Sequence, residues 1–297
     1  MRPLLLAMLL AGPALGAETA AFLDVGAGAR ATALGGAYTA LADDSDALYW
    51  NPAGLARMEK RQVSLSHAEL GGGNRHDYLS YAHPASRAPF AGAFTYLSYG
   101  SLDGRDALGR QTGAYNASDA AFAFGAGVKT EWADFGASGK YLRSHIGSME
   151  AQGVALDAGA RRELPAGSGK VVLAAALRNI GPGLKYADQR NDLPLRANFG
   201  AAYRFAAGHS VAAEIQDGPR GAGTEGGAGG EFKAGEGVFL RLGYTSKSAA
   251  IGGSGFDAAR GLTLGLGLSR GGYSLDYAAQ AAGELGNTHR FTLSARF

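Results

Sequence analysis

The chain has 297 residues with 28 basic and 26 acidic side chains, 48 glycines and no cysteine. The nearly neutral balance and the lack of a polybasic run give no electrostatic case for nucleic-acid binding, and the cysteine count excludes disulfides and a cysteine-linked lipid anchor. Glycine is about twice as frequent as the roughly 7% of an average protein, and it follows no collagen period.

Residues 1–17 have the pattern of a secretory signal peptide. Arg2 supplies the positive start, an apolar run follows from Leu4 to Leu10, and we expect cleavage after Gly16 or Ala17. The segment is too short to span a membrane as a helix. Because no later run of 18 apolar residues occurs, a β-barrel is the other way for the exported chain to span a bilayer.

Residues 18–61 form a distinct N-terminal segment. Alanine and leucine recur at helical spacing after Ala29, and the segment ends in the sharp turn Trp50-Asn51-Pro52-Ala53-Gly54. An acidic cluster precedes this turn, comprising Asp43, Asp44 and Asp46. The cluster lacks the spacing, the glycine and the glutamate of a calcium loop. We therefore expect these carboxylates to cap the short helix that enters Trp50.

From residue 62 to residue 297 the sequence alternates with a period of two, which predicts strands with one apolar face. Leu262, Leu264, Leu266 and Leu268, for example, alternate with Thr263, Gly265, Gly267 and Ser269. We predict fourteen strands over residues 62–69, 75–83, 89–99, 117–129, 132–145, 150–162, 169–180, 193–206, 208–216, 225–234, 237–245, 258–270, 272–280 and 287–297. Long loops are expected at 100–113, 180–193 and 247–258, with tight turns between the other strands.

An antiparallel transmembrane β-barrel fits these strands better than a soluble sandwich. The strand number is even, many strands have the roughly 9–11 residues of a membrane-crossing strand, and aromatic residues sit near strand ends as an interfacial girdle requires. The apolar face continues through Phe291 and Leu293 to the terminal Phe297. Such an end is usual for outer-membrane barrels, so we expect outer-membrane lipid and the barrel-assembly machinery as partners, with Phe297 as the assembly terminus.

Motifs for chemistry are weak. The run Gly26–Ala31 fits G-x-G-x-x-A, but no β-α-β pattern follows it. Gly139-Lys140 and Gly169-Lys170 are followed by Tyr and Val, so neither is a phosphate-binding loop. The six histidines have no metal-ligand spacing, and Ser254 lacks the second glycine of a hydrolase elbow. We predict no enzyme, cofactor or metal site, although a phospholipase-type barrel with a serine–histidine pair stays open.

Several motifs together resemble the PorV/PorQ family, a branch of the outer-membrane transport proteins related to the fatty-acid transporter FadL. They are Phe22-Leu-Asp-Val-Gly26, Gly28-Ala-Arg30, Ala33-Leu-Gly-Gly-Ala37, Ala42-Asp-Asp44, Tyr49-Trp-Asn-Pro-Ala-Gly-Leu55, Arg178-Asn-Ile-Gly181, Leu193-Pro-Leu195, Arg241-Leu-Gly-Tyr244, Asp276-Tyr277 and Leu285-Gly-Asn-Thr-His-Arg290. The resemblance implies a fourteen-stranded barrel with the N-terminal segment folded into the lumen as a hatch. A barrel of this width needs such a plug.

The resemblance leaves three functions open. FadL-like members pass hydrophobic compounds, which implies a diffusion channel with a ligand pocket and the hatch as its gate. PorV-like members are partners of a protein secretion system of the type IX kind and hold exported proteins at the surface. A barrel without specific cargo is the third. The hatch and gate motif comprises Gly35, Gly36, Asp43, Asp44, Trp50, Asn51, Pro52 and Gly54.

Overall fold

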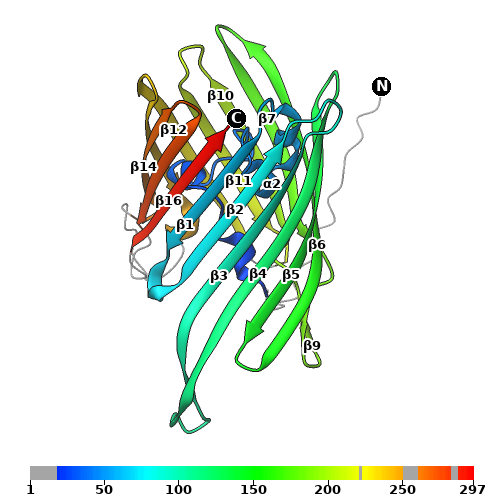
Figure 1. Cartoon of the computed structure of the whole chain (residues 1–297), viewed down its shortest axis with the longest axis vertical. Coiled ribbons are helices and arrows are strands. Elements are labelled where there is room, and N and C mark those ends of the chain that lie inside the picture. Colours follow the sequence, from blue (N-terminus) through cyan, green and yellow to red (C-terminus); the bar gives the residue numbers. More distant parts are fainter. Residues whose placement is uncertain (1–18, 221–222, 250–259, 282–286) are drawn as a thin grey trace.

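The computed structural model describes residues 19–220, 223–249, 260–281 and 287–297. Fourteen antiparallel strands close into one barrel, as predicted (Figure 1). Each strand pairs with its neighbours along the chain, β7 pairs with β10, and β1 closes the ring against β16. The barrel strands are β1 (Gln62–Glu69), β2 (Arg75–His83), β3 (Phe90–Arg105), β4 (Gln111–Lys129), β5 (Asp134–Ile146), β6 (Met149–Ala166), β7 (Gly169–Ile180), β10 (Arg196–Arg204), β11 (Ser210–Gly218), β12 (Gly223–Gly235), β13 (Val238–Thr245), β14 (Leu262–Arg270), β15 (Tyr273–Ala281) and β16 (Asn287–Arg296).

The two rims of the barrel differ in their connections. The turn rim has the short links, such as residues 167–168, 236–237 and 271–272, and the terminal Phe297, whose backbone pairs with Arg61. The loop rim has long links, such as residues 181–195 with the small hairpin β8 (Leu184–Tyr186) and β9 (Gln189–Asn191), as well as the two-residue link 147–148. Short turns on one rim and longer loops on the other are typical of outer-membrane barrels.

One predicted loop was wrong. Residues 100–113 do not form a loop, because β3 continues to Arg105 and β4 begins at Gln111. The two strands extend past the loop rim as a long hairpin, seen at the bottom of Figure 1. The pairing shifts register between Ser98 and Ser101, and beyond it both faces are largely exposed. The period-two pattern fades there because neither face meets an apolar medium. Of the predicted 247–258 loop, residues 250–258, with Ser254, lie outside the described residues.

The wall is apolar outside and polar inside, which reverses the arrangement of a water-soluble protein. On β10 the outward Phe199 is 57% exposed, whereas its inward neighbour Asn198 is 0% exposed. The same division holds on β13, where Leu240 faces outward and Arg241 is buried. An outward apolar band with a polar interior is the pattern of a membrane-spanning barrel. No helix among the described residues is long and apolar enough to cross a membrane.

Residues 19–61 lie inside the barrel as a plug, which we call the hatch (Figure 1). The hatch contains only short helices: η1 (Ala21–Asp24), α1 (Ala29–Ala33), α2 (Ala47–Trp50) and η2 (Pro52–Arg57). Gly35 and Gly36 have φ values of 66° and 78°, in the left-handed region that ends helices. The remaining short helices are η3 (Gly71–Gly73) after β1 and α3 (Ser246–Ala249) after β13.

Glycines let the hatch backbone touch the wall on two opposite groups of strands. A Cβ on Gly35 would lie 2.2 Å from the carbonyl oxygen of Tyr244 on β13. A Cβ on Gly136 of β5 would lie 2.2 Å from the carbonyl carbon of Pro52. Further wall glycines with hatch atoms inside 3 Å of a built Cβ are Gly125, Gly127, Gly159, Gly227, Gly229, Gly243 and Gly265. These strand glycines thus serve hatch packing and account for part of the unusual composition.

Candidate functional site

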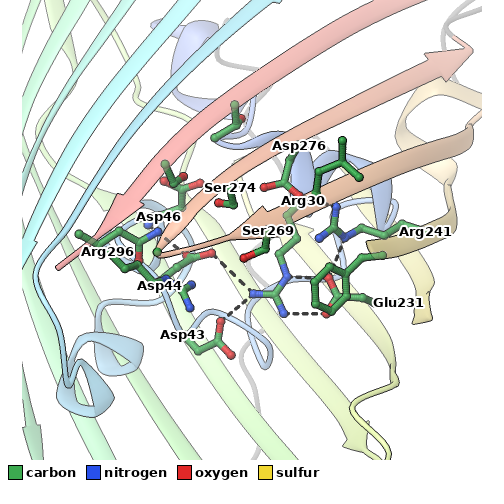
Figure 2. Close-up of a pocket in the computed structure, with 16 residues that line it drawn as sticks. Arg30, Asp43, Asp44, Asp46, Glu231, Arg241, Ser269, Ser274, Asp276 and Arg296 are labelled. Carbon is green, nitrogen blue, oxygen red and sulfur yellow. Dashed lines mark hydrogen bonds and ion pairs between the residues drawn. The ribbon is translucent and has the colours of Figure 1, made fainter. Parts of the chain in front are cut away.

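The hatch divides the lumen into a loop side and a turn side, each with its own cavity. The loop-side chamber, of about 280 Å³, is lined by Tyr49, Trp50 and the inward Arg178. The turn-side chamber, of about 230 Å³, is lined by Arg30, the acidic cluster and wall residues (Figure 2). A wider vestibule of about 700 Å³ lies beyond it around Arg57 and Arg204. The predicted hatch residues therefore border all three cavities.

Arg30 on α1 is the hub of the turn-side chamber (Figure 2). Its Nε and Nη2 donate to both carboxylate oxygens of Glu231 on β12, at 2.8 and 2.9 Å. Its Nη1 donates to Asp43 at 2.8 Å and to the Tyr38 hydroxyl at 3.0 Å. Such two-pronged pairing is among the strongest contacts that an arginine makes. Arg30 therefore joins the hatch to the wall and to its own acidic cluster.

Ion pairs extend from this hub in both directions as a continuous belt. Toward β15, Arg241 contacts Glu231 at 2.7 Å and Asp276 at 2.6 Å. Toward β6, Arg204 contacts the second oxygen of Asp43 at 3.1 Å. Arg204 also lies 3.9 Å from Glu163, which accepts from Arg161 at 2.6 Å. The hatch end of η2 joins through Arg57, which donates to Asp134 at 2.6 Å. The belt thus ties the hatch to strands on both sides of the barrel.

The acidic cluster has divergent protonation behaviour. Although burial alone raises its pKa, Arg30 and Arg204 hold the pKa of Asp43 below its ordinary value. Burial and the nearby Asp43 raise the pKa of Asp44, whose carboxylate accepts from the Tyr38 hydroxyl at 2.5 Å. Burial and the charge of Asp44 raise the pKa of Asp46 to about 8. The cluster therefore holds one charged carboxylate beside two that favour the proton.

The predicted capping role of this cluster is wrong. Asp46 does occupy the N-cap position of α2, but its side chain accepts no hydrogen bond from the helix. It accepts instead from the Ser80 hydroxyl on β2 at 3.2 Å. Asp44 accepts from the backbone N–H of Asp46 at 3.2 Å, before the helix begins. The carboxylates have ion-pair and wall partners that outcompete the helix end.

The Asn51–Gly54 turn is a packed junction. The Asn51 side chain is fully buried, accepts from the N–H of Ala53 at 3.1 Å and donates to the carbonyls of Thr39 and Ala160. The Asn51 side chain thus satisfies backbone groups on both sides of the turn. Pro52 follows the end of α2 at Trp50 and begins η2. At Gly54 a Cβ would lie 2.3 Å from the Ala42 carbonyl oxygen, so only glycine fits.

The loop-side chamber combines two aromatic rings with a buried arginine. The Trp50 indole donates to the Ala27 carbonyl at 2.9 Å, and the Tyr49 ring packs against it at 5.0 Å between centroids. The Arg178 guanidinium lies 4.9 Å from the Tyr49 centroid and 5.6 Å from that of Trp50. Gly35 and Gly36 also line this chamber. The predicted motif is therefore split, with the aromatic and glycine positions on the loop side and the carboxylates on the turn side.

The histidines in the described part of the chain form neither a metal-ligand cluster nor a pair with a serine. No group of three potential ligands there could hold a metal ion. His67 pairs with Asp77 at 2.7 Å, and His76 is buried with neither ring nitrogen bonded. No serine–histidine hydrogen bond occurs among the described side chains.

The family model that matches this chain is the uncharacterised protein family UPF0164, over residues 14–177, more than half of the sequence. The chain belongs to this family. No curated protein sequence matches the chain. Sequence comparison thus places the chain in a family without adding an activity.

Solved structures show which fold this UPF0164 member has. The toluene transporter TbuX of Ralstonia pickettii is 15% identical, with 92% of this chain and 98% of that chain covered and a TM-score of 0.65. The P. putida toluene transporter TodX is 15% identical, with 92% of this chain and 99% of that chain covered and a TM-score of 0.62. A Pseudomonas aeruginosa FadL homologue is 13% identical, with 89% of this chain and 96% of that chain covered and a TM-score of 0.53. The fold is that of FadL-type outer-membrane barrels.

Sequence reasoning missed the wall partners of the hatch. Glu231 was visible only as a charged residue within an alternating strand, and Arg178 and Arg241 appeared only in motifs of the family resemblance, without a role. A charge on the inward face of a membrane strand is a usable signal, because it must find a partner in the lumen. Which partner it finds depends on strand order around the ring, which a sequence does not display.

Proposed function

We propose that this barrel lies in the outer membrane and lets small hydrophobic or other small compounds cross it, with the hatch as the gate. The observation that supports this proposal is a lumen plugged by the chain's own N-terminal segment, with a cavity on either side. Short turns face the periplasm in outer-membrane barrels, so the loop-side chamber faces outward. The FadL-type fold, shared with proteins named as toluene transporters, is a further support.

We also propose that the assembly machinery recognises the terminal Phe297.

The moving part of the gate is residues 38–50 in this proposal. Both ends of this segment are held by backbone contacts, at Gly35 against β13 and at Pro52 against β5. Its middle is held by ion pairs and hydrogen bonds, and also by apolar contacts of Leu41 and Leu48 within the cluster that includes Tyr78 and Val172 of the wall. Opening the gate therefore breaks these apolar contacts as well, which sets the barrier between its two arrangements. The Asn51–Gly54 turn then acts as the fixed pivot of the gate. Displacing the segment would join the two chambers.

A cysteine cross-link provides the test, because the natural chain has no cysteine. The hydroxyl of Ser80 on β2 donates to that of Ser45 in the gate segment at 2.8 Å, so Ser45→Cys with Ser80→Cys is close enough for a disulfide. Uptake of toluene into liposomes holding the oxidised double variant should fall to that of empty liposomes and return after reduction.

The matched control for this lock is Ser64→Cys with Ser294→Cys, which joins two neighbouring wall strands where the hydroxyls lie 3.1 Å apart. Its uptake should be the same in both redox states. Equal uptake by the oxidised and reduced forms of the Ser45 and Ser80 variant would contradict the gate. A deletion of residues 33–54 should in turn leak, because it removes the gate segment.

A secretion partner of the PorV/PorQ type is the second candidate function. The observation that favours it is the long β3–β4 hairpin, which extends past the loop rim and is largely exposed on both faces. Such a surface can hold an exported protein without any passage through the lumen. The test is a pull-down from the native envelope with the full chain and with residues 101–114 replaced by a short turn. Loss of exported partners only from the shortened variant would support this function, and equal recovery would contradict it.

A further inference from the structure

Arg178 is a buried arginine without an acidic partner among the described residues, a condition that it shares with Arg290 on β16. The Arg178 side chain on β7 is 1% exposed, and among the described residues no carboxylate lies within ion-pair distance of it. Its Nη2 donates to Gln216 at 2.9 Å and its Nε to Asn198 at 3.3 Å. Its Nη1 has no hydrogen-bond partner. A buried charge in this condition is costly, so a group that neutralises it would bind favourably.

Aromatic rings of the hatch cover this guanidinium. Tyr49 and Trp50 lie 4.9 and 5.6 Å from its central carbon and line the same chamber. Ring faces attract a cation only weakly compared with a carboxylate that accepts two hydrogen bonds. A ligand that offers a carboxylate can therefore replace the rings at Arg178. A ligand that also offers a flat ring can stack on the displaced aromatic side chains.

The chamber's own carboxylates are already matched by other donors. Asp24 pairs with Arg196. Glu214 accepts from the backbone N–H groups of Tyr38 and Thr39, from the Thr39 hydroxyl and from Asn198. Glu225 lies 4.0 Å from Lys247 and accepts from Gln216 at 3.4 Å. The donor of this chamber that has no hydrogen-bond partner in the described structure is the Nη1 of Arg178.

We propose that the loop-side chamber binds a single-ring aromatic carboxylate, with its carboxylate on Arg178 and its ring against Tyr49 and Trp50. This inference rests on the proposed transport function and names the substrate class. A volume of about 280 Å³ is slightly below the roughly 300–1,000 Å³ of pockets for drug-sized ligands, which suits one ring. The ionisable residues that line the chamber itself are Arg178 and Lys247 against Asp24, Glu214 and Glu225. The excess of basic residues lies in the turn-side vestibule, which is lined by Arg57, Lys60, Lys129, Arg161, Lys170, Arg204 and Arg296 against Asp43, Glu59 and Glu163.

The test uses Trp50 as the reporter of binding. The chain has two tryptophans, and the other, Trp132, is 62% exposed near the turn rim, so Trp132→Phe leaves Trp50 alone. Benzoate should change the Trp50 fluorescence saturably in the full chain in detergent. Benzamide has the same shape without the charge and should bind at least about tenfold more weakly. Acetate, which has no ring, should bind similarly weakly.

Variants locate the effect at one side chain. Arg178→Gln keeps polar contacts to Asn198 and Gln216 but removes the charge, and it should weaken benzoate binding by about tenfold or more. Arg143→Gln, at an exposed pair with Glu150, should bind benzoate as the parent does. Equal affinity of the parent for benzoate and benzamide would overturn the inference even if Arg178→Gln failed to fold. So would unchanged benzoate binding by Arg178→Gln.

A neutral ligand separates this inference from the transport proposal. If toluene changes the Trp50 fluorescence saturably and benzoate does not, the chamber binds compounds without using Arg178. The inference then fails while the proposed function stands. A response to neither compound overturns the inference, and the cross-linking experiment on Ser45 and Ser80 still decides the transport function.

Discussion

On the turn side of the hatch, Arg30 and Arg241 each contact at least two carboxylates, whereas on the loop side Arg178 contacts none among the described residues. The turn-side arginines complete an ion-pair belt that joins the hatch to the wall. Arg178 instead faces a chamber whose nearest hatch groups are the rings of Tyr49 and Trp50. Satisfied charges stabilise a closed arrangement, and an unsatisfied one favours a ligand. The difference indicates a latch on one side of the hatch and a receiving site on the other.

The largest expected effect comes from removing the hub of the belt. Arg30→Ala leaves Asp43 without its nearest cation and Glu231 with Arg241 as its remaining one. Breaking a largely buried pair from one side costs about 3–5 kcal/mol. We expect the free energy of unfolding in urea to fall by that amount and the channel conductance in planar bilayers to rise.

The control for Arg30 is Arg143→Ala, which breaks an exposed pair with Glu150. Exposed pairs contribute about 0–1 kcal/mol, so this variant should unfold and conduct like the parent. If both variants behave alike, the belt does not hold the hatch and the comparison between its two sides fails.

A smaller effect on stability is expected where the hatch backbone packs directly against a wall glycine. Gly136→Ala on β5 would place a methyl group 2.2 Å from Pro52, and overpacking of this kind costs about 1–3 kcal/mol. Gly139→Ala lies on the same strand, where a Cβ meets nothing closer than 3.8 Å. Urea unfolding of the two variants should show destabilisation only for Gly136→Ala. Equal stabilities would mean that the hatch is held by its charges alone.

Strand alternation was sufficient to predict most of the barrel. The pattern at Leu262–Leu268 reports directly on a membrane outside and a filled lumen inside, so the strands and their inward faces followed from the sequence. The long β3–β4 hairpin escaped prediction because both faces of its extension, beyond Ser98, are largely exposed and the regular alternation of a membrane strand is lost there. The belt escaped because Arg30 and Glu231 are 201 positions apart. Only the closed ring brings such residues together.

The acidic cluster should make stability depend on pH. Asp46 has a pKa of about 8 because it is buried beside Asp44, whereas an unfolded aspartate titrates near pH 4. The folded protein therefore binds the extra proton between those values, and stability falls as pH rises from about 4 to 8. The slope reaches at most about 1.4 kcal/mol per pH unit for one group.

Asp46→Asn should reduce this slope in urea unfolding measured between about pH 5 and 8. Asp44, whose pKa is also raised, keeps part of it. Asp43 acts in the opposite direction, and only below its ordinary pKa, because its own pKa is lowered. Asp106→Asn, at the exposed hairpin tip where backbone hydrogen bonds lower the aspartate pKa, should leave the slope unchanged. If the unfolding free energy of Asp46→Asn kept the full pH slope of the parent, the slope would come from groups other than Asp46.

The smallest expected change in stability is that of Arg178→Met, and measuring it beside Arg241→Met tests the comparison most directly. Arg178→Met on β7 and Arg241→Met on β13 remove inward arginines of similar burial from the loop side and the turn side of the hatch. Arg241→Met leaves Asp276 without this cation and removes one of the two arginines that pair with Glu231. It should therefore lower the free energy of unfolding by about 3–5 kcal/mol. Arg178→Met gives up two hydrogen bonds to neutral amides but also relieves an uncompensated buried charge, so its unfolding free energy should stay within about 1 kcal/mol of the parent. Urea unfolding of both variants under one condition measures the difference. Similar losses in the two would show that Arg178 already has its counter-charge, and the loop-side chamber would then need no anionic ligand.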